Sequence, residues 1–241
     1  MTGGNGLPPT RVIYYHLVGE PLADGLAGGP SAGMITPPRQ LGAHIALLRR
    51  LGYRFATAGE LAMEWQGPVP PPGIAVLTFD DGWRDGLTTA APLLARHGVR
   101  ATFFVCPAGF GRHAPAFGEA GVVMTEDEAR QLHETGMELA SHTWSHRPVK
   151  ELSDGELRHE MVASRDAVEA ITGEPCLTLA YPSGNHDRRV EQAAADAGYQ
   201  LAFATQSEAW RKFAVPRAFA PPLDPPERLI EKMGLLEQAP A

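Results

Sequence analysis

Two groups of titratable side chains in this 241-residue sequence have the types and spacing that metal-assisted hydrolysis needs. The first group is the adjacent pair Asp80 and Asp81, which Gly82 follows directly. The second group is His142 and His146, four positions apart in the run SHTWSH. Residues four apart on a helical turn face the same way, so both imidazoles can converge on one ion. Two histidines and a carboxylate form a donor set that suits a divalent transition metal such as zinc.

Each group also has an ordinary structural explanation when it is taken alone. Aspartate followed by glycine is a common turn pair that can begin a helix. Two histidines with this spacing also occur on solvated helix faces. The combination favours a metal site, because both groups follow predicted strands. Two adjacent carboxylates repel each other there unless a cation lies beside them.

The elements that must position these groups alternate between short apolar runs and segments of helical periodicity. Apolar and β-branched runs predict strands at 11–15, 53–56, 74–78, 101–105, 137–140, 176–180, 199–204 and 214–217. Periodicity, capping boxes and glycine stops predict helices at about 40–51, 58–66, 87–97, 125–135, 153–172, 188–197 and 227–236. A long Gly/Pro-rich loop spans residues 19–38.

Seven or eight alternations of strand and helix predict an α/β fold with a parallel sheet covered by helices. At this length they favour a distorted (β/α)7-8 barrel, formed by one catalytic domain over residues 1–241 with residues 1–10 loosely held. Residues that follow the strands of a barrel share one rim. The polar groups at such positions are His16, Asp80–Asp81, His142–His146 and Tyr181–Gly184.

Composition narrows the possible partners and location. The net charge is −7 without a basic stripe, which argues against nucleic acid as a partner. No apolar run approaches the roughly 20 residues of a membrane span. The N-terminus lacks the basic and apolar regions of a secretory signal, so a cytoplasmic location is expected. Cys106 and Cys176 are far apart and predicted to be free thiols.

The motifs TFDDG at 78–82 and SHTWSH at 141–146 resemble the first two motifs of the polysaccharide deacetylase (NodB homology, carbohydrate esterase 4) family. The segments FDDGWRDG, ATFFV, ELASHTWSH and AYPSG follow in the expected order, and the similarity extends from about His16 to Arg217. The resemblance implies a distorted barrel. It also implies a metal-dependent hydrolase that removes an N-acetyl group from an amino sugar or a molecule containing one.

The resemblance also implies roles for the four matching side chains. Asp80 would be the catalytic base, and Asp81, His142 and His146 would bind the metal. Zinc is expected, with cobalt, nickel or manganese as alternatives. The ion would activate a water, and Asp80 would take its proton during attack on the amide carbonyl.

The third motif departs from the family pattern. An Arg-x-Pro-Tyr-Gly segment is usual, whereas residues 180–184 read AYPSG, so the arginine that braces the catalytic aspartate is predicted to be absent. Ser183 replaces the second tyrosine, but its backbone N–H can still stabilise an oxyanion. Tyr181 and Pro182 of this segment are predicted to contact the substrate, as is Trp83.

The general acid must also come from another place than usual, because no Leu-x-His motif occurs late in the chain. Tyr15-His16 resembles the N-terminal Tyr-His of the biofilm-exopolysaccharide deacetylase branch, so we assign the acid to His16. A surface histidine beside the site is the alternative, since any histidine titrates near neutrality. His186 and Asp187 are expected to cap the next helix, or else to orient the substrate or Asp80.

Three functions remain open from the sequence. The first is deacetylation of an amino sugar, polymeric or small, with a carbohydrate as the partner. The second keeps the hydrolase but changes the substrate, to a formamide or a cyclic amide. The third is a catalytically silent carbohydrate-binding protein, although the presence of all four motif residues argues against it.

Overall fold

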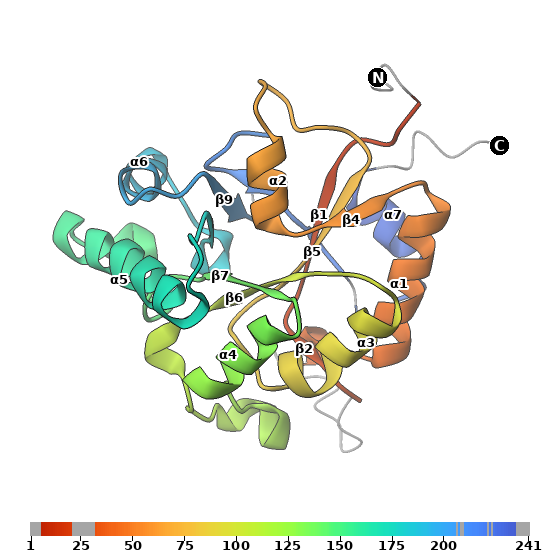
Figure 1. The fold of residues 1–241 in the computed structure, drawn as a ribbon, viewed down its shortest axis with the longest axis horizontal. Coiled ribbons are helices and arrows are strands. Elements are labelled where there is room, and N and C mark those ends of the chain that lie inside the picture. Colours follow the sequence, from red (N-terminus) through yellow and green to blue (C-terminus); the bar gives the residue numbers. More distant parts are fainter. Residues whose placement is uncertain are drawn as a thin grey trace.

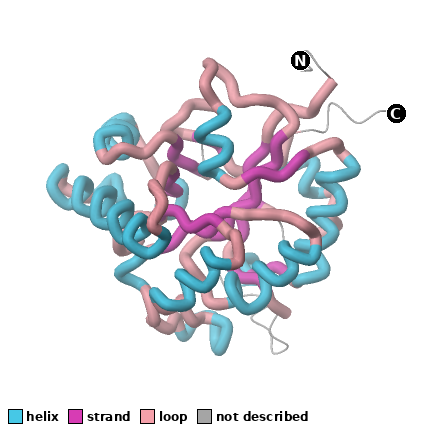
Figure 2. Tube along the Cα trace, viewed as in Figure 1, coloured by secondary structure: helices cyan, strands magenta, loops and turns pink. Residues whose placement is uncertain are grey.

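The computed structural model describes residues 6–20, 32–205, 207, 210–220, 222 and 224–234. Short apolar runs form the strands at its centre, and helices surround them (Figures 1 and 2). The strands of the main sheet are β1 Arg11–Tyr15, β4 Arg54–Ala56, β5 Ile74–Phe79, β6 Thr102–Val105, β7 Glu138–Ser141, β8 Thr178–Ala180, β9 Leu201–Ala204, β10 Val215–Pro216 and β11 Ala218–Phe219. All six residues of β5 are buried, as expected for a strand covered on both faces.

All pairings in this sheet are parallel, in the order β10-β9-β8-β7-β6-β5-β1-β11, with β4 beside the start of β5. The last two strands are consecutive in the chain but pair with opposite ends of the sheet. Val215 of β10 pairs with Phe203, whereas Ala218 of β11 pairs with Ile13. The segment 215–219 therefore joins the two ends into a nearly closed barrel, with Arg217 at the seam. The predicted (β/α)7-8 barrel is confirmed.

The helices largely follow the sequence prediction. They are α1 Pro38–Arg50, α2 Ala58–Glu64, α3 Ala91–Arg96, α4 Glu126–Glu134, α5 Asp154–Thr172, α6 Arg188–Asp196 and α7 Arg228–Lys232. The capping boxes at the start of α4 and α5 form as predicted, and Gly173 ends α5 in the left-handed conformation. The helix predicted over 87–97 is divided, because a π-helical turn, Gly86–Ala90, precedes α3.

Two short strands, β2 Leu17–Val18 and β3 Ile35–Thr36, pair with each other outside the barrel. They border the long predicted loop, of which residues 21–31 lie outside the described part of the chain. Residues 235–236 of the last predicted helix also lie outside it.

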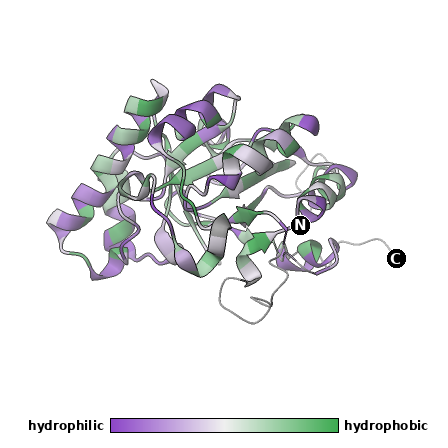
Figure 3. Ribbon diagram, turned by 90° about the horizontal axis from the view of Figure 1, so that it is seen from below, coloured by the Kyte–Doolittle hydropathy of each residue, from purple (hydrophilic) through white to green (hydrophobic). Residues whose placement is uncertain are grey.

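The barrel has an apolar layer on each side of its strands. Apolar residues concentrate on the strands, and hydrophilic residues on the outer helix faces (Figure 3). Inside the barrel, Val12, Val76, Phe104 and Phe203 cluster with residues of α2. Their strand neighbours pack outward against the helices. This alternation continues past the strand ends, because successive side chains of a strand point to opposite faces. It directs four polar or aromatic residues to the barrel mouth: Tyr14, Asp80, His142 and Arg217.

The composition predicted free cysteines and no membrane span, and the described residues bear on both predictions. Cys106 and Cys176 are buried free thiols, as expected. The longest described helix, α5, carries charged residues along its length, and no described helix has the length and apolar character that a membrane crossing requires.

Candidate active site

Asp81, His142 and His146 each bring one ligand atom to a common point at the carboxyl ends of β5 and β7. These atoms lie within 4.8 Å of one another. Asp81 Oδ1 is 3.5 Å from His142 Nε2 and 3.4 Å from His146 Nε2. His142 Nδ1 lies 2.7 Å from the carbonyl oxygen of Ala180. Because a carbonyl only accepts, Nδ1 carries the hydrogen and Nε2 keeps its lone pair for an ion. The three residues therefore fit a divalent metal.

The charges of this cluster are coupled. Burial alone would raise the pKa of Asp81, but His142 and the neighbouring histidines hold it below its usual range. Burial would lower the pKa of His142, yet Asp80 and Asp81 raise it. Burial and the adjacent His142 lower the pKa of His146. Buried carboxylates beside imidazoles make this point of the barrel favourable for a cation.

The backbone is strained at this end of the barrel. Among the described residues, four that are not glycine have positive φ, namely Asp81 (72°), Thr143 (66°), His146 (59°) and Ser183 (55°). Three of them lie in the pocket described below, and Thr143 lies between the two histidines. Such conformations are costly for residues with a Cβ and persist where the surrounding structure holds them.

Asp80 forms a buried ion pair with Arg217. Its side chain is 4% exposed and that of Arg217 is 1% exposed. Arg217 donates from Nη1 to Asp80 Oδ1 and from Nη2 to Oδ2, both at 2.7 Å. The guanidinium also lies over the ring of Tyr14, 4.9 Å from its centre. Burial would raise the pKa of Asp80, but Arg217, with His142 and His16, holds it below its usual value.

The arginine is absent from the third motif, as the sequence shows, but Asp80 has an arginine partner all the same. The brace comes from the barrel seam, 137 residues away in sequence, in place of the third motif. The sequence carried one signal that could have identified this partner. Arg217 ends the last predicted strand, and the ends of barrel strands meet at one rim.

A pocket of about 200 Å³ joins these groups. Its lining residues are Tyr14, His16, Met34, Asp80, Asp81, His142, His146, Ser183, Gly184, Thr205 and Arg217. His16 follows β1 and has a buried Nδ1 without a hydrogen-bond partner in the described structure. Ser183 is exposed at the rim, and its carbonyl accepts a bond from the Thr205 hydroxyl at 3.2 Å. A side chain at Gly184 would collide with Thr205, so this close approach needs glycine.

Three predicted substrate contacts lie away from the pocket lining. Tyr181 is fully buried, donates from its hydroxyl to the Phe213 carbonyl at 3.1 Å, and stacks on His186. Pro182 is also buried. Trp83 is 6% exposed and packs on Phe117. None of the three lines the pocket, so their contact with a substrate stays a prediction.

Trp83 instead contacts a predicted metal ligand. Its Nε1–H donates to Asp81 Oδ2 at 3.1 Å, which leaves Oδ1 directed at the histidines. Asp187 caps α6 as predicted, accepting the Val190 N–H at 2.9 Å. His186 lies 3.5 Å from Glu191, and its contacts hold the third-motif loop.

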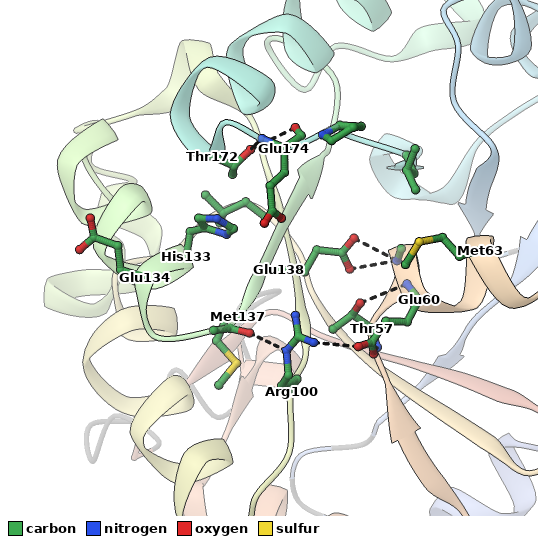
Figure 4. Close-up of a pocket in the computed structure, with 15 residues that line it drawn as sticks. Thr57, Glu60, Met63, Arg100, His133, Glu134, Met137, Glu138, Thr172 and Glu174 are labelled. Atoms are coloured by element: carbon green, nitrogen blue, oxygen red, sulfur yellow. Dashed lines mark hydrogen bonds and ion pairs between the residues drawn. The ribbon is translucent and has the colours of Figure 1, made fainter.

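A second, larger cavity of about 630 Å³ lies at the opposite end of the barrel, around the starts of β6, β7 and β8 (Figure 4). Several of its polar groups are already paired. Both oxygens of Glu138 accept hydrogen bonds from the Gly59 N–H, at 2.9 and 3.1 Å, and Thr102 donates to one of them. Arg100 pairs with Glu60 and the Gly136 carbonyl. These bonds join α2 to the starts of β6 and β7 at the wall of the cavity.

The family described as Polysaccharide deacetylase matches residues 68–202, more than half of the chain. The Bacillus subtilis protein YxkH is 26% identical over 171 residues, covering 70% of this chain and 58% of YxkH. The peptidoglycan-N-acetylglucosamine deacetylase PgdA of Listeria monocytogenes is 28% identical over 117 residues, covering 48% of this chain and 22% of PgdA. The chain thus spans less than two thirds of either relative.

Solved structures show the same fold over nearly the whole chain. The Streptococcus pyogenes deacetylase PplD, in complex with acetate, superimposes with a TM-score of 0.79 at 24% identity, covering 94% of this chain and 99% of PplD. IcaB from Ammonifex degensii gives 0.75 at 21% identity, covering 95% and 97%. At these identities the likeness establishes the shared barrel.

Proposed function

Because this chain belongs to the polysaccharide deacetylase family, we propose that it is a metal-dependent hydrolase that removes an N-acetyl group from an amino sugar or a molecule containing one. One observation carries the proposal. Three convergent ligand atoms, from Asp81, His142 and His146, share a small pocket with the buried, arginine-paired Asp80. These groups support the proposal, because amide hydrolysis by a metal enzyme needs metal ligands and a base in one pocket.

Asp81, His142 and His146 would hold the ion. When bound, a divalent metal lowers the pKa of water and polarises a carbonyl oxygen. Two imidazole nitrogens and one carboxylate favour zinc, with cobalt, nickel or manganese as alternatives. The hydrogen bonds at His142 Nδ1 and at Asp81 Oδ2 orient two of the three ligands.

Asp80 is the proposed base for the attacking water. The bidentate pair with Arg217 fixes both carboxylate oxygens in the pocket and keeps the group ionised. Each carboxylate oxygen can accept more than one hydrogen bond, so the pair with Arg217 leaves acceptor capacity for a water proton. Arg217 thus orients Asp80 and still leaves lone pairs of its carboxylate free to accept a hydrogen bond.

His16 and Ser183 are proposed to act on the amide itself. His16 lines the pocket from the end of β1, where its protonated ring would give a proton to the departing amine. Ser183 lines the same pocket and is exposed, and its backbone N–H would donate to the oxyanion. The relation to the branch with an N-terminal Tyr-His motif rests on the role of His16.

The size of the pocket and the names of the relatives both bear on the substrate. A volume of about 200 Å³ is below that of typical ligand pockets, so it suits the acetylated end of a sugar better than a whole oligosaccharide. PgdA is named for N-acetylglucosamine in peptidoglycan, which suggests N-acetylglucosamine units as first substrates. The cytoplasmic location and the single domain over 1–241 stay predictions.

The test is product release from a panel of amides. Protein stripped of metal and then loaded with zinc, cobalt, nickel or manganese is incubated with N-acetylglucosamine oligomers, a formylated amine and a cyclic amide. Acetate release by loaded wild type but not by Asp80→Asn, with metal retained in both, is the expected result. Formate release or ring opening alone would favour the alternative hydrolases. Carbohydrate binding without turnover and without stoichiometric metal would favour a silent binding protein.

A further inference from the structure

The loop that carries both histidines has little regular structure of its own. It runs from the end of β7 at Ser141 to His146, and Thr143 and His146 both hold positive φ. Residues with a Cβ keep such conformations only where contacts hold them. The groups that hold this loop therefore decide whether His142 and His146 face the same point.

Glu160, on α5, makes three of these contacts. Glu160 is buried, with 3% of its surface exposed. The carboxylate accepts the Ser145 N–H at 2.8 Å and the Ser145 hydroxyl at 2.5 Å. Its backbone carbonyl accepts the Trp144 N–H at 3.0 Å. One residue thus binds the two loop positions directly before His146.

Ser164, four residues along α5, holds the other end of the same loop. Its hydroxyl is 2.8 Å from the Ser141 hydroxyl oxygen. Ser141 in turn accepts the Thr143 N–H at 3.2 Å. Two residues on successive turns of α5 therefore bond to the loop, Ser164 before Thr143 and Glu160 after it.

The charge of Glu160 is not explained by an ion pair. In the part of the chain that the structure describes, no arginine, lysine or histidine forms a salt bridge with it. A buried carboxylate without a cation costs free energy, and an apolar residue would serve helix packing better. Bonds from N–H and O–H groups to a carboxylate are stronger than those to a neutral acceptor. The carboxylate therefore stabilises the protein through its two hydrogen bonds from Ser145.

We propose that Glu160 is a positioning residue for the metal site, which fixes Ser145 and thereby directs His146 towards Asp81 and His142. The inference rests on the metal-binding triad of the proposed function. Partners that orient metal ligands typically change metal affinity by about 10- to 100-fold when removed. We expect Glu160→Leu to weaken zinc or cobalt binding by that factor, because it removes the acceptors and leaves the ligands in place.

The experiment measures zinc and cobalt dissociation constants by competition with a chromogenic chelator, together with the absorption spectrum of the cobalt-loaded protein. Glu160→Gln keeps one acceptor oxygen for the Ser145 N–H, so an intermediate loss is expected. Asp166→Asn is the matched control, since it removes a negative charge from an exposed position of the same helix. Its affinity and spectrum should equal those of wild type. At saturating metal, the turnover of Glu160→Leu should recover most of its loss.

Equal metal affinity and an unchanged cobalt spectrum in Glu160→Leu would overturn this role while leaving the metal site intact. A wild type that binds neither ion would instead overturn the metal site of the proposed function, and this role with it. Should Glu160→Leu fail to fold, Glu160→Gln and Ser145→Ala carry the test, because each removes only part of the contact. Wild-type affinity in both of these folded variants would also refute the proposal.

Discussion

At the carboxyl ends of the strands, Asp81, His142 and His146 direct ligand atoms at one point, whereas at the opposite end Glu138 directs its carboxylate at the backbone of α2. The second end has the larger cavity, about 630 Å³ against about 200 Å³. Size alone would therefore select the end that lacks the convergent ligand atoms of Asp81, His142 and His146. The two ends differ in how their carboxylates are placed: Asp81 meets two histidines at one point, whereas Glu138 is bonded to the backbone of α2 and to Thr102.

The backbone differs between the two ends in the same sense. All four described non-glycine residues with positive φ belong to the loops at the carboxyl ends, Asp81 and Ser183 among them. At the other end a glycine creates the fit, because a side chain at Gly59 would collide with the carboxylate of Glu138. Strained backbone conformations are typical of functional sites, whereas unstrained packing is sufficient where residues only connect secondary-structure elements.

The largest expected effect comes from removing a ligand at the carboxyl end. His142→Ala should reduce bound metal to background and turnover by about 10³-fold or more, since the proposed hydrolysis depends on the ion. Metal analysis and acetate release measure the two effects. His133→Ala changes the same residue type beside the second cavity and should leave both unchanged. An equal loss in the two variants would erase the distinction between the ends.

Arg217→Met should destabilise the protein by about 3–5 kcal/mol, because it leaves Asp80 buried without its counter-charge. Denaturant unfolding measures the change. The double variant Asp80→Asn, Arg217→Met should be more stable than Arg217→Met alone, since no unpaired charge remains. If the double variant is the less stable of the two, the ion pair is not what links the barrel seam to the base.

His16→Ala should slow amide cleavage by about 10²- to 10⁴-fold while metal content stays at the wild-type level. The loss should be smaller for substrates whose leaving group needs no proton, such as activated esters. Comparing amide and ester turnover measures this difference. Wild-type amide turnover would remove His16 from the mechanism.

Trp83→Phe keeps most of the packing but removes the hydrogen bond to Asp81. Metal affinity should fall by about 10-fold, because the carboxylate loses the donor that orients it. Chelator competition gives the affinity, and thermal unfolding checks that the ring still packs. Trp65→Phe is the control, since Trp65 is buried in the barrel interior and its Nε1 has no partner in the described structure. Equal affinities in the two variants would contradict a role for the indole N–H.

The smallest effect is expected at Glu138. Burial raises its pKa above the usual value, so folding favours its protonated form. Wild type should therefore lose stability as pH rises through the raised pKa. Glu138→Gln should lack this loss, with a stability change of about 1 kcal/mol near neutrality and unchanged kcat/KM. Thermal unfolding across pH measures the first effect, and altered kcat/KM would give the second cavity a part in function.

Local patterns in the sequence predicted most of the barrel and the convergence of the triad Asp81, His142 and His146. The strand at 11–15 and both capping boxes match the structure, because strand and helix starts depend on neighbouring residues. The triad could be found for a similar reason. Asp80–Asp81 and His142–His146 are close in sequence, and a barrel brings strand ends together whatever its exact register.

Other features depended on packing that no short segment specifies. The sequence placed Tyr181, Pro182 and Trp83 near the strand ends, but only the tertiary contacts buried them outside the pocket lining. The division of the helix after Gly86 is another such feature.

The partner of Asp80 shows the limit most clearly. The sequence by itself determined that a carboxylate would stand at the end of the central strand. Only the closure of the barrel, which seats the segment 215–219 between β9 and β1, decided that Arg217 would neutralise it. Charge pairing acts through space, so residues 137 positions apart become partners only once the sheet has closed.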